Sequence, residues 1–392
     1  MKKKLVSAFL VMVNIFLMTF LFSCTINDAE KTKYIGESTP TEKNYYVNNS
    51  TQEVETWGAL DTFDMQKDVC ASFDISNSKH LDENGNPLFV VANLTDIHYS
   101  HDRSRLSRKN ALNKISKFIQ ETNPDLITIT GDLISYFEDK DDYLTTLCYF
   151  LDSFDIPWAP ILGNHDGFDP IQRSAIADVF ISDEYNNVIF RRNDPELGVG
   201  NYIINITNGS EIIHSIIMLD SHSERIYPDG TKGYDYIWEP QFTWYEWAVN
   251  GLAQVNDNSA VPVSCFLHIP LVEYIAAFEG YQEGIFSGVN DNNEAICCPG
   301  HLNPDGPHNN GFFDHAKSLG TKLFLCGHDH TNSSYIDYQG TTLAYSLCSK
   351  GNRSCNGKRT VGTTVSYGIN GDFTLKSYIS SFGKIKSIDN LA

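Results

Sequence analysis

Carboxylates, imidazoles and one amide recur at five places in this sequence, each directly after a short apolar run. The five segments are Thr95-Asp96-Ile97-His98, Gly131-Asp132, Gly163-Asn164-His165-Asp166, His268, and Gly327-His328-Asp329-His330. Side chains of these types bind metal ions, and a set without thiolates is typical of Fe, Mn or Zn rather than of a closed structural zinc site. One such segment occurs often by chance. Five in series favour a metal centre over a collection of turn caps and surface histidines.

The apolar runs alternate with helical patterns in a way that brings these segments together. Strands are predicted at 88–95, 125–130 and 156–162, with helices at 104–121 and 142–153 between them. This order predicts βαβ units with right-handed crossovers and a largely parallel sheet. Ligands of such sheets bind at the carboxyl ends of the strands, where the five segments lie. The glycines before Asp132, Asn164 and His328 permit the tight turns that this placement requires.

The pattern in the second half of the chain predicts strands with few helices. A helix is expected to begin near Glu239-Pro240, and residues 284–311, rich in Gly, Asn and Pro, are expected to form a long loop. The absence of a helical pattern between the last strands predicts antiparallel pairing there. Further strands are predicted at 201–206, 211–219, 261–267, 321–326, 341–347 and 361–367.

Composition limits the class of partner. The chain has 392 residues, 29 Lys and Arg against 49 Asp and Glu, and a formal net charge of −20. This charge argues against a general nucleic-acid or anionic-membrane binder, because the field of the whole protein repels polyanions. A phosphate substrate is not excluded, because metal ions in a site reverse the local sign.

The N-terminus has the pattern of a targeting segment. Lys2, Lys3 and Lys4 precede an apolar run that ends at Phe22, and Cys24 follows Ser23. Residues 1–23 are therefore predicted to be a signal peptide of the lipoprotein type; an ordinary cleaved signal and an uncleaved anchor are the alternatives. All three place the protein outside the cytoplasm, in the cell envelope or secreted, with membrane contact only through an N-terminal lipid or anchor. Residues 24–50 read as a polar tether and 51–85 as an N-terminal extension.

Nine cysteines are too few for a scaffold built on disulfides. In an oxidising compartment Cys348 and Cys355 are the most plausible local pair. Cys265 and Cys326 lie in apolar runs and are expected to pack in the core. The adjacent Cys297 and Cys298 have no partner that the sequence identifies.

These motifs make the sequence resemble the calcineurin-like metallophosphoesterase superfamily over about residues 86–370, and within it the purple acid phosphatase-like branch. Supporting segments are Ile156-Pro157-Trp158, Gly233–Trp238, His268-Ile269-Pro270-Leu271 and Gln282–Ile285. The resemblance implies an α/β fold: a four-layer α/β/β/α sandwich with mixed sheets and a dimetal site at the strand carboxyl ends. Residues 86–380 would form this catalytic domain.

The resemblance also implies a set of site residues and two transition-metal ions, divalent or trivalent, of Fe, Mn or Zn. His165 would face the substrate, and Asp166 would orient the His165 side chain. Purple acid phosphatases proper have a tyrosine ligand three residues after the second Asp; this chain has Ser135 there, so an iron–tyrosinate bond is not carried over. One metal would be held by Asp96, His98, Asp132 and His330, and the other by Asp132, Asn164, His268 and His328.

The implied activity is hydrolysis of a small phosphate ester, with no nucleic-acid partner. The leading hypothesis is a phosphomonoesterase in which a metal-bridging hydroxide attacks and His165 assists the leaving group. A phosphodiesterase acting on nucleotides or phospholipid head groups would use the same metal cluster. A non-catalytic surface binding lipoprotein is the alternative from a different class. No Gly-x-Ser-x-Gly elbow is present, consistent with a mechanism without a serine nucleophile.

Other polar and aromatic residues have an ordinary interpretation beside the functional one. His101 and Arg103 could touch substrate but fit a solvated loop better, and His222 could line the cleft or lie in a surface turn. The loop at 284–311, with His301 and His308, could cover the site. Aromatic residues that could stack on a substrate, although packing is their commoner use, are Tyr234, Tyr236, Trp238, Trp244 and Trp247.

Overall fold

The strands that precede the first three motifs pair side by side in one sheet. In the computed structural model, β4 (Pro87–Leu94), β5 (Leu126–Thr130) and β6 (Trp158–Ile161) are parallel neighbours. Their residues are almost all buried, as expected for strands covered on both faces. Antiparallel strands extend this sheet on the β4 side, in the order β16 (Thr360–Tyr367), β17 (Phe373–Ser381) and β18 (Lys384–Ser387), and β3 (His80–Leu81) also pairs with β4.

A second sheet carries the other two motifs. Its neighbours β8, β11, β13 and β15 run parallel, and the outer pairings β7·β8 and β14·β15 are antiparallel. The antiparallel pairing predicted between the last strands was wrong for 321–326 and 341–347, which pair parallel as β13 and β15, because the chain first passes through the unpredicted strand β14. The strands in spatial order are β1 (Tyr45–Val47), β2 (Val69–Asp74), β7 (Tyr202–Asn208), β8 (Glu211–Met218), β11 (Val263–Phe266), β13 (Thr321–Cys326), β15 (Thr341–Tyr345), β14 (Tyr335–Tyr338) and β12 (Gly288–Val289).

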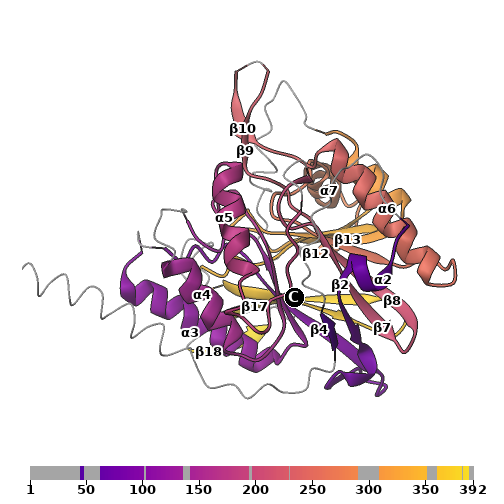
Figure 1. Cartoon of the computed structure of the whole chain (residues 1–392), viewed down its shortest axis with the longest axis horizontal. Helices are drawn as coiled ribbons and strands as arrows, with labels where there is room; N and C mark the ends of the chain where they lie inside the picture. The colour runs from indigo at the N-terminus through magenta and orange to yellow at the C-terminus, as the bar shows by residue number, and fades with distance from the viewer. Residues whose placement is uncertain are drawn as a thin grey trace, which may run out of the picture.

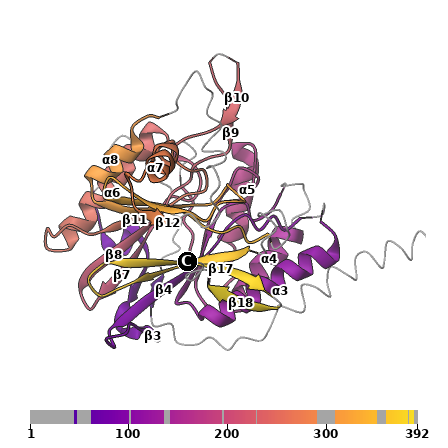
Figure 2. The same ribbon diagram turned by 180° about the vertical axis from the view of Figure 1, so that it is seen from behind.

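Helices cover the outer face of each sheet, which gives the four-layer α/β/β/α order (Figures 1 and 2). One helical layer contains α3 (Arg105–Thr122), α4 (Asp142–Asp152) and α5 (Pro170–Phe180). The other contains α6 (Glu239–Val255), α7 (Glu273–Gln282) and α8 (Phe312–Ser318). The short elements are α2 (Met65–Asp68), the 3₁₀ turn η1 (Ile75–Asn77) and the hairpin of β9 (Glu224–Ile226) and β10 (Lys232–Tyr234).

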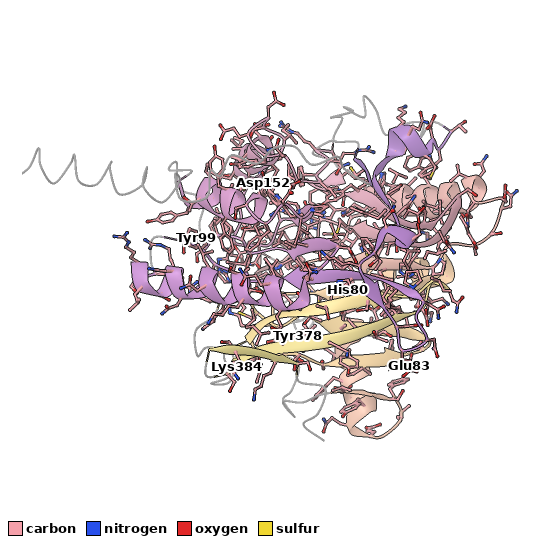
Figure 3. The ribbon with its side chains drawn as sticks, turned by 90° about the horizontal axis from the view of Figure 1, so that it is seen from below. His80, Glu83, Tyr99, Asp152, Tyr378 and Lys384 are labelled. Atoms are coloured by element: carbon pink, nitrogen blue, oxygen red, sulfur yellow. The ribbon has the colours of Figure 1, made fainter. Side chains whose placement is uncertain are left out.

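Local chemistry explains where α3 begins and ends. The Ser104 side chain accepts a hydrogen bond from the backbone N–H of Ser107, and Asn123 adopts the left-handed conformation that ends many helices. Seen from below, α3 lies beside the strands that carry Tyr378 and Lys384 (Figure 3). The Phe118 and Tyr378 rings are 5.2 Å apart, and Lys117 Nζ donates to the carbonyl of Gly383. The buried face of α3 thus joins it to the first sheet.

Alternation along the central strands divides the core into two layers. On β13, Leu323 and Leu325 face the cluster between the sheets, whereas Phe324 and Cys326 face the cluster under α6, α7 and α8. Cys265 on β11 faces the same way as Cys326, and both are fully buried, which confirms their prediction as core residues. Period-two patterning thus lets one sheet bury both faces.

The structure describes residues 62–100, 103–135, 142–193, 197–228, 230–289, 309–350, 360–381 and 383–387, and the backbone of 45–47. Three residues of the predicted tether form β1, and the predicted extension supplies β2, which pairs with β7. Among the described residues, no helix is both long and apolar enough to cross a membrane. The predicted signal segment 1–23, the rest of the tether, and His101, Cys297, Cys298, His301, His308 and Cys355 lie outside this range.

The core between the sheets should carry much of the stability. Leu323→Ala removes a fully buried side chain, so we expect it to lower the free energy of unfolding by about 2–5 kcal/mol. Leu106→Ala is the matched control because Leu106 is 68% exposed, and its effect should stay within about 0.5 kcal/mol. Urea denaturation followed by circular dichroism measures both. Equal effects would contradict the placement of Leu323 between the sheets.

Candidate metal centre

The five predicted ligand segments meet at one edge of the molecule, but they come from both sheets. Those after β4, β5 and β6 belong to one sheet, and those after β11 and β13 belong to the other. The carboxyl ends of the two sheets therefore form the site together. Two mixed sheets in an α/β/β/α sandwich, with the site at the strand carboxyl ends, are what the family resemblance implied.

The first group of ligand atoms comes from Asp96, His98, Asp132 and His330, which all lie within 4.8 Å of one another. Asp96 Oδ1 is 3.1 Å from His330 Nε2, and Asp132 Oδ2 is 3.4 Å from His98 Nε2. The two imidazole nitrogens, His98 Nε2 and His330 Nε2, are 3.0 Å apart. Two carboxylates and two imidazoles therefore point at one small volume, as in a metal site.

The second group uses the other oxygen of Asp132. Asp132 Oδ1 lies 3.4 Å from His268 Nε2, which is itself 2.9 Å from Asn164 Oδ1. His328 Nδ1 is 3.0 Å from the same Asn164 oxygen and 3.3 Å from His268 Nε2. The Asp132 carboxylate therefore joins two groups of ligand atoms, which is the arrangement of a bridging ligand.

Hydrogen bonds between the ligand residues and their surroundings determine which ligand atoms face the site. Asp96 Oδ2 accepts from the Thr95 hydroxyl and the His328 backbone N–H, whereas the buried Asp96 Oδ1 accepts no hydrogen bond. His268 Nδ1 is 2.8 Å from the Thr130 carbonyl and donates to it, so Nε2 is the ring nitrogen that faces the site. Ring protons can bridge the short contacts between these nitrogen and oxygen atoms when no ion is bound, and metal ions would take the place of those protons. The residues present therefore fit bound metal ions.

The pKa values of the ligand residues agree with a metal site. Burial lowers the pKa of His98 and of His328 to about 3, so both rings are neutral and available as ligands at neutral pH. Burial alone would raise the pKa of Asp96, but the adjacent His330 lowers it to about 2. Burial would likewise lower the pKa of His268, but the Asp132 carboxylate raises it to about 9. The carboxylates thus attract positive charge, which metal ions would supply.

Four of these residues have strained backbones. Asp96, His98, Asp132 and His328 have φ of 51°, 47°, 54° and 71°, in the left-handed region that non-glycine residues rarely occupy. Each costs roughly 1–3 kcal/mol and persists only where its surroundings enforce it. Here the loops after β4 and β5 bond to each other, since the N–H groups of Asp96 and His98 donate to the carbonyls of Gly131 and Asp132.

Two of the predicted glycines, Gly163 and Gly327, are needed for close approach rather than for a positive φ. A Cβ on Gly163 would lie 2.2 Å from Asp132 Oδ1, and one on Gly327 would lie 1.9 Å from Thr95 Oγ1 and 2.9 Å from Asp96 Oδ2. Any side chain at either position would displace a ligand carboxylate.

His165 lies beside the first ligand group. Its ring centroid is 5.1 Å from that of His98, and its backbone N–H donates to Asp132 Oδ1. Its Nδ1 is 3.2 Å from the Ser135 carbonyl, so a backbone group orients the ring. The carboxylate of Asp166 accepts from the N–H groups of Ile134 and Gly163, and burial raises its pKa to about 7. Asp166 thus holds the loop that carries His165.

Two further expectations were wrong. Arg103 is buried and donates to the carbonyls of Ile97 and Lys350, so it braces the His98 loop rather than lying in solvent or facing substrate. His222 is also buried, stacked on Trp238 at 3.7 Å and bonded to Gln241, so it lies neither in a surface turn nor in a cleft.

An arginine that the sequence analysis did not single out stabilises the third ligand loop, which follows β6. Arg173, on α5, donates to the Gly163 carbonyl and forms a buried ion pair with Asp220 at 2.5 Å. A single arginine in a helix gives no sequence signal of this kind, because the partners lie 10 and 47 residues away.

Comparison with known proteins agrees with the interpretation of these residues as a metal site. The family model described as calcineurin-like phosphoesterase matches residues 89–332, more than half of the chain. The chain belongs to the calcineurin-like phosphoesterase family. This confirms the predicted superfamily, whose characteristic chemistry is metal-dependent hydrolysis of phosphoric esters.

Several named proteins are similar to this chain. "Probable inactive purple acid phosphatase 14" of Arabidopsis thaliana is 26% identical over 70% of this chain and 73% of its own length. "Phosphatase DCR2" of Saccharomyces cerevisiae is 27% identical over 70% of this chain, which spans only 49% of that protein. Among solved structures, "GAP50 the anchor in the inner membrane complex of Plasmodium" aligns with a TM-score of 0.48 and 11% identity, over 76% of this chain and 88% of that one.

The close approach at Gly327 should be essential for metal binding. Gly327→Ala places a methyl group against Thr95 and Asp96, so we expect metal content to fall from about two ions per chain to one or none. Gly209→Ala is the control, because no atom lies within 4 Å of the new Cβ, although Gly209 has a positive φ and Gly327 does not. Elemental analysis of both purified variants decides, and full metal content in Gly327→Ala would contradict the site geometry.

Proposed function

We propose that this protein is a metal-dependent phosphomonoesterase that hydrolyses a small phosphate ester. The observation that carries the proposal is the Asp132 carboxylate, which directs one oxygen to each of two complete ligand groups. Asp96, His98 and His330 would complete one metal site. Asn164, His268 and His328 would complete the other.

Two bound ions would neutralise the phosphoryl oxygens and lower the pKa of a water molecule enough for it to act as the nucleophile. The chain's own residues then need to hold the ester and assist departure of its alcohol. His165 is suited to the second task because it is next to the ligand groups and the Ser135 carbonyl, 3.2 Å from its Nδ1, orients its ring. A proton delivered from this ring to the leaving oxygen would prevent a costly alkoxide.

Catalysis rather than binding alone is supported by the complete set of ligand side chains. Some similar proteins carry "inactive" in their names, and one is named a phosphatase. The alternative of a non-catalytic binding lipoprotein predicts a degraded site. In this chain every ligand position that the motifs predicted has a metal-binding side chain, and these side chains converge.

We also propose that the enzyme acts outside the cytoplasm, attached to a membrane through lipidated Cys24. The support is the sequence alone: a basic start at Lys2–Lys4, an apolar run to Phe22, and a cysteine directly after Ser23.

His165→Ala should separate catalysis from metal binding. We expect this variant to keep about two metal ions per chain and to lose roughly 10²–10⁴-fold in kcat, the usual contribution of general acid catalysis. His80→Ala, on β3, is the matched control and should keep full activity. Metal analysis beside steady-state kinetics makes the test. Loss of metal together with activity would give His165 a structural role.

The ester preference is measured on the wild-type protein with 4-nitrophenyl phosphate and its bis(4-nitrophenyl) diester. We expect the monoester to be cleaved, activity to disappear with a chelator, and activity to return when Mn²⁺, Zn²⁺ or Fe²⁺ is added back. Preference for the diester would favour the phosphodiesterase alternative. Chelator-resistant turnover would contradict a metal-dependent mechanism.

A further inference from the structure

A pocket adjoins the second ligand group. The ring of Tyr234, which lines this pocket, meets the His328 ring edge-on, with centroids 4.3 Å apart. Ile269, which follows the ligand His268, lines it too, and its N–H donates to Ser221 Oγ. The Tyr234 ring thus lies between the pocket and His328. A group attached to a phosphate held by the metal centre would therefore lie beside the pocket.

Five aromatic side chains line the pocket: Tyr227, Tyr234 and Tyr236, and Phe312 and Phe313 of α8. Tyr227 and Tyr234 belong to the β9–β10 hairpin, which projects from the top of the molecule, and Tyr236 follows it (Figures 1 and 2). The Arg225 guanidinium lies over the Tyr236 ring at 4.8 Å and pairs with Asp235 at 3.2 Å. The Tyr227 hydroxyl donates to the Tyr234 carbonyl. These contacts hold the rings in place before any ligand binds.

The charge of the wall is negative. Glu273, in the first turn of α7, points its carboxylate into the lining, where Oε1 accepts a hydrogen bond of 2.7 Å from Asn309. Partial burial raises the pKa of Glu273. The other acidic residue, Asp235, is balanced by Arg225, and among the described residues no Lys, Arg or His lines the pocket.

Aromatic faces and the Glu273 carboxylate together attract cations. Tyrosine rings attract ammonium groups through their electron-rich faces, more strongly when solvent is excluded. A second phosphate on the substrate would be repelled by Glu273 and would find no basic partner in this lining. The metal centre and the pocket thus have opposite preferences at adjoining positions.

We propose that the pocket binds a positively charged ammonium group on the alcohol part of the phosphate ester. The substrate class would be a zwitterionic amino-alcohol phosphate, with its phosphate at the metal centre and its ammonium group against Glu273 and the three tyrosines. This rests on the proposed phosphomonoesterase function for the position of the phosphate. The pocket itself can be tested without hydrolysis.

Binding of the cation alone is the first test. Choline and its uncharged isostere 3,3-dimethylbutanol differ only in the central atom, N⁺ or C, so their difference in affinity reports charge recognition. By ligand-observed NMR titration we expect wild type to bind choline at least fivefold more tightly than the isostere, and Glu273→Gln to remove this preference. Gln keeps the acceptor for Asn309, so the wall is preserved. Glu283→Gln, an exposed position just after α7, is the matched control. No preference in wild type, or its persistence in Glu273→Gln, would overturn the proposal.

Hydrolysis of the matching esters is the second test. The ratio of kcat/KM for phosphocholine to that for 3,3-dimethylbutyl phosphate should fall at least fivefold in Glu273→Gln and in Tyr236→Leu, and stay unchanged in Glu283→Gln. Turnover of both esters with a ratio that no variant changes would overturn the pocket assignment and leave the phosphatase intact. Choline binding that depends on Glu273, without turnover of any ester, would uphold the pocket and contradict the proposed activity.

Discussion

The convergence of buried carboxylates and imidazoles on Asp132 is the constraint on which the rest of this structure depends. Two groups of oxygen and nitrogen atoms share the Asp132 carboxylate, and they approach one another closely, with His328 Nδ1 3.0 Å from Asn164 Oδ1. The buried carboxylates of Asp96 and Asp132 need positive charge beside them, which protons on the imidazoles supply in the absence of an ion and metal ions would supply when bound. The left-handed backbones of Asp96, His98, Asp132 and His328 add a further cost, which the surrounding loops must balance.

The sandwich meets this constraint by supplying rigid strand ends from two sheets. β4, β5 and β6 bring three ligand loops, and β11 and β13 bring two, so no single loop has to span the site. Two buried arginines stabilise the ligand loops. Arg103 donates to the Ile97 carbonyl, and Arg173 donates to the Gly163 carbonyl while it forms an ion pair with Asp220. Both are buried and engaged in structure, so the positive charge that a phosphate needs is left to the metal ions.

Much of this was predictable from sequence, for a local reason. Each ligand follows a strand directly, so the strand pattern fixed the edge at which Asp96, Asn164 and His268 lie. Bounds were close too, with the helix predicted at 104–121 observed at Arg105–Thr122. What failed depends on contacts between distant residues. Arg103 donates to the Lys350 carbonyl, and His222 stacks on Trp238. The same holds for the tyrosine pocket, which combines the hairpin with the segment after His268.

Asp132 is the residue that would bridge two metal ions. Electron paramagnetic resonance of the protein loaded with Mn²⁺ can detect such a bridge, because two Mn²⁺ ions that share a carboxylate are exchange-coupled and give a spectrum distinct from isolated ions. We expect about two Mn²⁺ per chain with a coupled spectrum, and loss of the coupling in Asp132→Ala. One ion per chain, or two ions with the spectrum of isolated Mn²⁺, would contradict it.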